Sequence, residues 1–183
     1  MNLIETVRDT RTLNGGVPVY ANAEVDISVV EAVNVNPTAL YVLLPGIRWL
    51  ASTADRLSRK GVNIFDLSEI YDDGEVTMGP PLVEWSDNTW AIVDGIHRFW
   101  LSLKENIPLR AIMVRGADPR FPLVGLPIQW EEVSQYEIKP EQASQLKRLR
   151  PGIEDTSEVL RSHYRDLRYL GSRGRRPRHG QTN

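Results

Sequence analysis

Apolar and polar positions along the chain predict a mixture of short strands and helices. In five short segments, apolar residues alternate with polar ones or run together, a pattern typical of strands. Strands are therefore expected over residues 17–20, 25–30, 82–85, 89–93 and 109–114. Residues 86–88, Ser-Asp-Asn, separate the third segment from the fourth, which predicts a β-hairpin.

Other segments place apolar residues at helical spacing. Ile47, Leu50, Ala54 and Leu57 would line one face of a helix that ends before Gly61. Helices are expected over residues 46–60, 64–70, 97–106, 139–149 and 156–170. Strands and helices in this mixture predict the α+β class.

The predicted elements divide the chain into four parts. Residues 1–16 are expected to be an irregular N-terminal extension, and residues 17–138 an α+β domain with a small mixed sheet. A helical extension over 139–170 and a disordered basic tail over 171–183 would follow. Within the domain, residues 116–127 contain three prolines and are expected to form a lid or a binding loop.

Composition excludes several kinds of chemistry. The chain has no cysteines, which excludes disulfides, thiolate metal sites and cysteine nucleophiles. The three histidines, His97, His163 and His179, lack paired-ligand spacing, so a metal cage built by the protein alone is not expected. There is no run of about 18 apolar residues and no apolar signal segment at the N-terminus. We therefore expect a cytoplasmic protein with no membrane partner.

Charge is distributed unevenly along the chain, although the net charge is only −2. Residues 145–183 hold ten Lys or Arg and four acidic residues, a net +6, and residues 1–144 carry a net −8. A basic end on an acidic body indicates a polyanionic partner for the tail, docking of the tail on the body, or a solvated terminus. Such docking would take place within one chain or across a homodimer.

Arginines at this end are the predicted nucleic-acid contacts. Arg161, Arg165 and Arg168 would form one stripe of the last predicted helix, beside an apolar stripe that includes Tyr164. The tail adds Arg173, Arg175, Arg176 and Arg178. No helix-turn-helix, zinc finger or single-strand stacking motif accompanies them, so we expect sequence-independent contact with the DNA backbone.

The turn after the fourth predicted strand carries the most specific chemistry. At the start of a helix, unpaired backbone N–H groups and the positive end of the helix dipole favour an anion. Gly95 lets a ligand approach the backbone closely, and Arg98 adds a planar set of donors suited to phosphate. The predicted phosphate site consists of Gly95, Ile96, His97 and Arg98.

Asp94, His97 and Arg98 are the predicted catalytic residues of this turn. Asp94 would bind Mg²⁺ or accept a proton from an attacking hydroxyl or water, or it would only cap the helix. His97 would donate to a phosphate or carry a proton, or it would be hydrogen-bonded within the fold.

Residues 93–98, Val-Asp-Gly-Ile-His-Arg, resemble the core of the ParB/sulfiredoxin superfamily. In that superfamily a strand, a G-x-[HR]-R turn, a helix and a strand that opens with a proline follow one another, and Pro108 holds the last place here. The resemblance is closest over about residues 78–115 and implies an α+β fold with a small mixed sheet. Sulfiredoxin chemistry is excluded, because Ile96 stands where its cysteine would be.

The resemblance also implies that residues 17–138 bind ATP or another nucleotide with Mg²⁺. In the free-serine kinases of the superfamily the motif is likewise Asp-Gly-x-His-Arg, and its Asp is taken as catalytic. Those kinases also use a Glu on the helix after the first strands, but residues 45–50 of this chain contain none. Arg48, in that segment, would face the nucleotide or belong to a solvated helix face.

Three functions follow from these observations. The absent Glu and the basic end favour a Mg²⁺-dependent nucleotide hydrolase that contacts or cleaves DNA. The superfamily that the chain resembles includes nucleases and plasmid proteins that inhibit conjugation, which agrees with this function. The Asp-Gly-x-His-Arg motif favours a kinase that phosphorylates a small molecule such as a free amino acid. A regulatory module that binds a nucleotide without turnover is the third. The first of these is the one we favour from the sequence.

Overall fold

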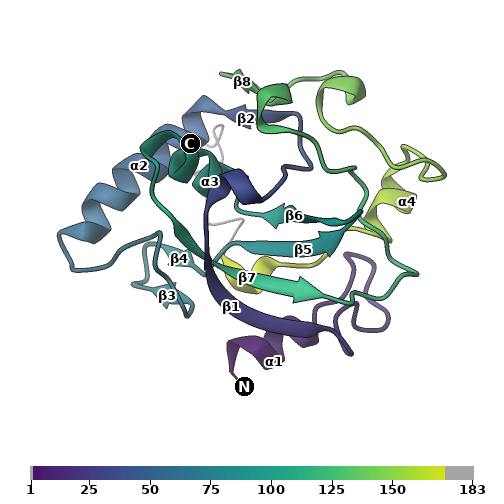
Figure 1. Ribbon diagram of the computed structural model, residues 1–183, viewed down its shortest axis with the longest axis horizontal. Helices are drawn as coiled ribbons and strands as arrows, with labels where there is room; N and C mark the ends of the chain where they lie inside the picture. Colours follow the sequence, from purple (N-terminus) through teal and green to yellow (C-terminus); the bar gives the residue numbers. More distant parts are fainter. Residues whose placement is uncertain (1, 172–183) are drawn as a thin grey trace, which may run out of the picture.

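A four-stranded mixed sheet lies at the centre of the structure, a computed structural model that describes residues 2–171 (Figure 1). Its strands lie in the order β1 (Glu24–Val30), β7 (Leu109–Arg115), β5 (Leu82–Ser86) and β6 (Thr89–Asp94). β1 pairs antiparallel with β7, β7 pairs parallel with β5, and β5 forms an antiparallel hairpin with β6. The predicted α+β class with a small mixed sheet is confirmed.

Two small pairs of strands accompany this sheet. β2 (Tyr41–Leu43) pairs parallel with β8 (Ser134–Tyr136), and β3 (Tyr71–Asp72) pairs antiparallel with β4 (Thr77–Met78). Short 3₁₀ helices occur at Ala32–Asn34, Trp130–Glu132, Ala143–Gln145 and Arg168–Leu170.

Four α-helices surround the sheet in the described residues: α1 (Leu3–Arg8), α2 (Leu44–Ser58), α3 (Ile96–Glu105) and α4 (Ser157–Arg161). α2 packs on α3, where Leu101 meets the buried face of α2. The predicted helices over 46–60 and 97–106 are confirmed, with their ends moved by one or two residues. Within the described part of the chain, no helix has the length and apolar character needed to cross a membrane.

Both faces of the sheet are buried. Successive residues of a strand point to opposite faces, so Leu82 joins one apolar cluster and Val83 the other. Phe99 of α3 packs on the Val83 face. On the Leu82 face the sheet packs against Val7 of α1 and against Leu167, so the first and last described segments of the chain share one core.

The structure corrects three predictions in the first half of the chain. Residues 1–16 are not irregular throughout, because a capping box between Asn2 and Glu5 starts α1. Residues 64–70 do not form a helix, because the Asn63 side chain accepts the N–H of Phe65 in a local turn (3.0 Å). Residues 17–20 also lie outside any strand.

Larger corrections fall in the C-terminal part. Residues 139–149 contain only a 3₁₀ turn, because their backbone bonds to distant segments: Leu40 N–H donates to Leu146 O (3.0 Å) and Leu126 N–H to Arg148 O (2.8 Å). The helix expected over 156–170 ends at Arg161. Beyond it, Asp166 N–H donates to Arg11 O (2.8 Å) and draws the chain back to the N-terminal segment.

Candidate functional site

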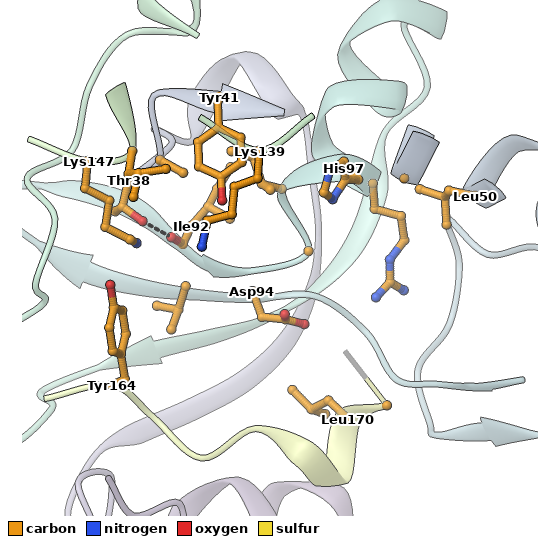
Figure 2. Close-up of a pocket in the computed structure, with 18 of the residues that line it drawn as sticks. Thr38, Tyr41, Leu50, Ile92, Asp94, His97, Lys139, Lys147, Tyr164 and Leu170 are labelled. Carbon is orange, nitrogen blue, oxygen red and sulfur yellow. Dashed lines mark hydrogen bonds between the residues drawn. The ribbon is translucent and has the colours of Figure 1, made fainter. Parts of the chain in front are cut away.

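A cavity of about 430 Å³ opens beside the N-terminus of α3 (Figure 2). Its volume is typical of a small-molecule site. The residues that line it come from four parts of the chain, within 38–50, 77–78, 92–98 and 139–171. The predicted phosphate turn and the C-terminal segment therefore face one cavity.

Gly95 shapes the turn where β6 gives way to α3. Its φ of 87° lies in the left-handed region, and a Cβ atom there would lie 2.5 Å from Cβ of Pro81. The N–H groups of Arg98 and Phe99 both donate to Gly95 O (2.9 and 3.1 Å), and no side chain caps the helix. The positive end of the α3 dipole is thus presented to the cavity, which Gly95, Ile96 and His97 line.

Replacing Gly95 with alanine is expected to lower the free energy of unfolding by at least about 2 kcal/mol, from left-handed strain and overlap with Pro81. Gly116→Ala is the matched control, because Gly116 has a φ of 82° and nothing within 4 Å of an added Cβ. It should cost only the strain, about 1 kcal/mol. Urea unfolding measures both, and equal losses would show that the Pro81 contact is unimportant.

Arg98 is the buried cation of the site. It is 6% exposed, it lines the cavity, and its Nη1 atom is buried without a hydrogen-bond partner in the described structure. Burial lowers the pKa of Arg98 to about 10, and the nearby Asp94 carboxylate partly opposes that shift. A buried donor without a partner costs free energy. The geometry therefore favours an anionic ligand that accepts a hydrogen bond from this atom.

Asp94 ends β6 and points into the cavity (Figure 2), and its charge acts on Arg98, which lines the same cavity. It does not cap α3, because Gly95 occupies the N-cap position and no side chain caps the helix. The predicted helix-cap role is therefore wrong. In the described residues no cluster of three or more His, Asp or Glu could hold a metal ion, so a cation at Asp94 would need ligand oxygens as further partners.

His97 connects the two helices beside the cavity. Its Nε2 accepts the backbone N–H of Leu43 (3.0 Å), the residue immediately before α2, so Nε2 carries no proton. Gly46 lies so close that a Cβ there would be 3.0 Å from Nε2. The hydrogen-bonded role within the fold is thus the one the structure shows, and the ring still lines the cavity.

Two predicted ligand-binding arginines are engaged elsewhere. Arg48 forms two hydrogen bonds with the Glu137 carboxylate on the surface (2.9 and 2.8 Å), and it does not line the cavity. Arg165, predicted to contact DNA, is buried instead: its side chain is 1% exposed and pairs with that of Glu84, which is 4% exposed (2.9 Å). Its guanidinium is not available to a phosphate backbone.

The other predicted DNA contacts are exposed or lie outside the described residues. Arg161 donates to Leu13 O (3.3 Å), and Arg168 pairs with Asp166 at the surface. The early end of α4 separates these side chains, so the predicted stripe does not form. The four tail arginines, Arg173, Arg175, Arg176 and Arg178, lie outside the described residues.

Sequence reasoning missed several polar residues of the cavity, among them two lysines and a tyrosine. Lys139, Lys147 and Tyr164 line it, although the first two were expected on a separate helical extension and Tyr164 on an apolar stripe. The Lys147 ammonium lies 5.4 Å from the centroid of the Tyr164 ring. The basic character of this segment was the signal that could have indicated them.

Comparisons with known proteins agree with this architecture. The family model described as the ParB CE domain matches residues 2–134. No curated protein and no solved structure matches the chain. The matched region covers most of the chain and includes the turn at Gly95, which confirms the ParB-like resemblance found in the sequence. The chain belongs to the ParB CE domain family.

Proposed function

We propose that the cavity binds the phosphates of ATP or another nucleotide and that the protein is a Mg²⁺-dependent nucleotide hydrolase. One observation carries this proposal: Arg98 lines a cavity at an uncapped helix N-terminus, and its buried Nη1 has no hydrogen-bond partner among the described residues. Both features favour a ligand with several negatively charged oxygens.

Each residue of the turn would have a distinct part in hydrolysis. Arg98 and the first N–H groups of α3 would bind phosphate oxygens and stabilise the charge that develops during phosphoryl transfer. His97 would hold the start of α2 against α3, because its Nε2 bonds to Leu43 N–H. Asp94 would orient the attacking water beside them.

Magnesium fits this site only together with the nucleotide. Asp94 would be its protein ligand and phosphate oxygens the others, since the described residues contain no larger carboxylate cluster. The ion would neutralise charge on the phosphates.

DNA contact is a separate part of the proposal. Arg161 and Arg168 are exposed, and the four tail arginines add charge beyond the described residues. Such contacts would be non-specific and lost with salt. Arg165 does not belong to this surface, because it is buried against Glu84.

A small-molecule kinase is the second candidate, and the extent of the cavity favours it. Figure 2 shows the cavity continuing from His97 past Asp94 to Lys147 and Tyr164. That end has polar side chains suited to a second substrate, which a hydrolase that uses only water would not need.

The test is phosphate release from Mg²⁺-ATP, with and without duplex DNA. Asp94→Asn is expected to lower kcat at least about 100-fold. The control is Asp155→Asn, which makes the same change at an exposed carboxylate of the same cavity and should alter kcat by less than about threefold. ATP binding without phosphate release under either condition would overturn the hydrolase in favour of a kinase or a regulatory module.

A further inference from the structure

We infer that Lys147 binds a second anionic group, a carboxylate or a phosphate, at the end of the cavity away from Arg98. This inference rests on the proposed function, in which Arg98 and the α3 N-terminus form the first anion site. Figure 2 shows Lys147 and Tyr164 at one end of the cavity and His97 and Leu50 at the other. A ligand, or a pair of ligands, with two separated negative groups would fill both ends.

The backbone on both sides of Lys147 is fixed by distant segments. Leu146 O accepts the N–H of Leu40, and Arg148 O accepts the N–H of Leu126. Gly125 packs against the lysine stem, because a Cβ there would lie 3.4 Å from Cδ of Lys147. Contacts with distant segments of the chain therefore fix the position of this lysine.

The ammonium group of Lys147 lies over an aromatic ring and has no acidic partner among the residues that the structure describes. Its contact with Tyr164 is a cation–π interaction, and the described residues give it no ion pair or hydrogen bond. Tyr164 is held in turn by Leu13, whose N–H donates to Tyr164 O (2.8 Å). Lys147 is half-buried, and an anionic ligand would neutralise its charge and accept hydrogen bonds from its ammonium group.

Charge around Lys147 is consistent with such a site. Burial lowers the pKa of Lys147 to about 8, and within residues 2–171 no carboxylate opposes this shift. Lys139, of the same sign, extends toward the same cavity (Figure 2), and the exposed Asp155 lies near Tyr164. Tyr41 completes the wall of this end.

The second site lies in the part of the chain beyond the matched family region. The family match ends at residue 134, whereas Lys139, Lys147 and Tyr164 all follow it. This C-terminal segment thus closes the cavity and supplies its second set of charges. We therefore assign to it the selection of the second anion.

The experiment is calorimetric binding to the full chain of four probes: Mg²⁺-ATP, AMP, inorganic phosphate and glycerate, which carries a carboxylate and two hydroxyls. The variant is Lys147→Met. The control is Lys104→Met, because Lys104 also lies over a ring, that of Trp100 (4.6 Å to the centroid), but is exposed and outside the cavity. Lys104→Met should leave all four affinities within about twofold.

The result distinguishes the two sources of the anion. If an acceptor molecule supplies it, Lys147→Met weakens glycerate or phosphate binding at least about tenfold and leaves ATP binding within about twofold. If the nucleotide supplies it, the variant weakens ATP about tenfold more than AMP. Unchanged affinity for every probe would overturn the inference. A wild type that fails to bind ATP would instead overturn the proposed function, and the phosphate and glycerate measurements would still decide the role of Lys147.

Binding at this site should also depend on pH. Lys147 has a pKa of about 8, so it loses its charge as the pH rises above that value. The affinity of the wild type for the anionic probe should therefore fall between pH 8 and pH 9. Tyr164 stays neutral there, because burial and the charge of Asp155 raise its pKa. Lys147→Arg, which keeps its charge, should abolish this dependence, and an equal fall in that variant would contradict the assignment.

Discussion

Replacing Arg165 with methionine is expected to lower the free energy of unfolding by about 3–5 kcal/mol, because it leaves the Glu84 carboxylate buried without its cation. Arg165 Nη2 donates to both oxygens of Glu84 (3.0 and 2.9 Å) and to Phe121 O (2.8 Å). Tyr20 donates its hydroxyl hydrogen to the same carboxylate (2.8 Å). Urea unfolding of the variant and the wild type measures the loss.

Two variants control this measurement. Arg168→Met removes an exposed arginine that pairs with Asp166, and it should cost less than about 1 kcal/mol. The double variant Arg165→Met with Glu84→Gln should regain part of the lost stability, because no charge is then buried alone. A loss below about 1 kcal/mol in Arg165→Met would show that the pair does not hold the C-terminal segment to the sheet.

Replacing Arg98 with methionine is expected to weaken Mg²⁺-ATP binding about 100-fold. In the wild type, Arg98 Nη1 has no hydrogen-bond partner in the described protein and would donate to a phosphate oxygen. A charge-assisted hydrogen bond of this kind contributes about 1.5–3 kcal/mol. The same variant removes a buried cation, but it also takes the positive charge away from the nearby Asp94 carboxylate, so no gain in stability is expected. Calorimetry measures the affinity, and urea unfolding shows that the variant folds.

Arg48→Met is the matched control for this second variant. Arg48 is also an arginine near the start of a helix, but it is exposed and paired with Glu137. It should leave the ATP affinity within about twofold. Equal affinity of Arg98→Met and the wild type would contradict the phosphate site at α3.

The local sequence was sufficient to predict the central elements. The hairpin of β5 and β6 follows from the alternation around Asp87 and Asn88, which adopt the positive φ angles that its tight turn requires (54° and 61°). α3 and the turn at Gly95 follow from a strand, a glycine and helical spacing in immediate succession. In each case the signal and the structure lie within a few residues of each other.

The C-terminal part could not be predicted in the same way, because distant residues determine it. Helical spacing placed Arg165 on a solvated stripe, but its partner Glu84 lies 81 positions earlier in β5. The place of Lys147 depends on hydrogen bonds that residues 40 and 126 make to its neighbours. A pattern read along one segment does not contain these partners.

The shared core of the first and last segments has a consequence for how the protein is made. Thr10 bonds to Tyr169 (2.7 Å), and Leu13 and Arg11 bond to the backbone around Tyr164. During synthesis α1 leaves the ribosome long before its packing partner Leu167. The nascent chain therefore keeps α1 and the Leu82 face of the sheet exposed until Leu167 has emerged. A product shortened to the family-matched region would leave Glu84 without its cation and the cavity without one of its walls.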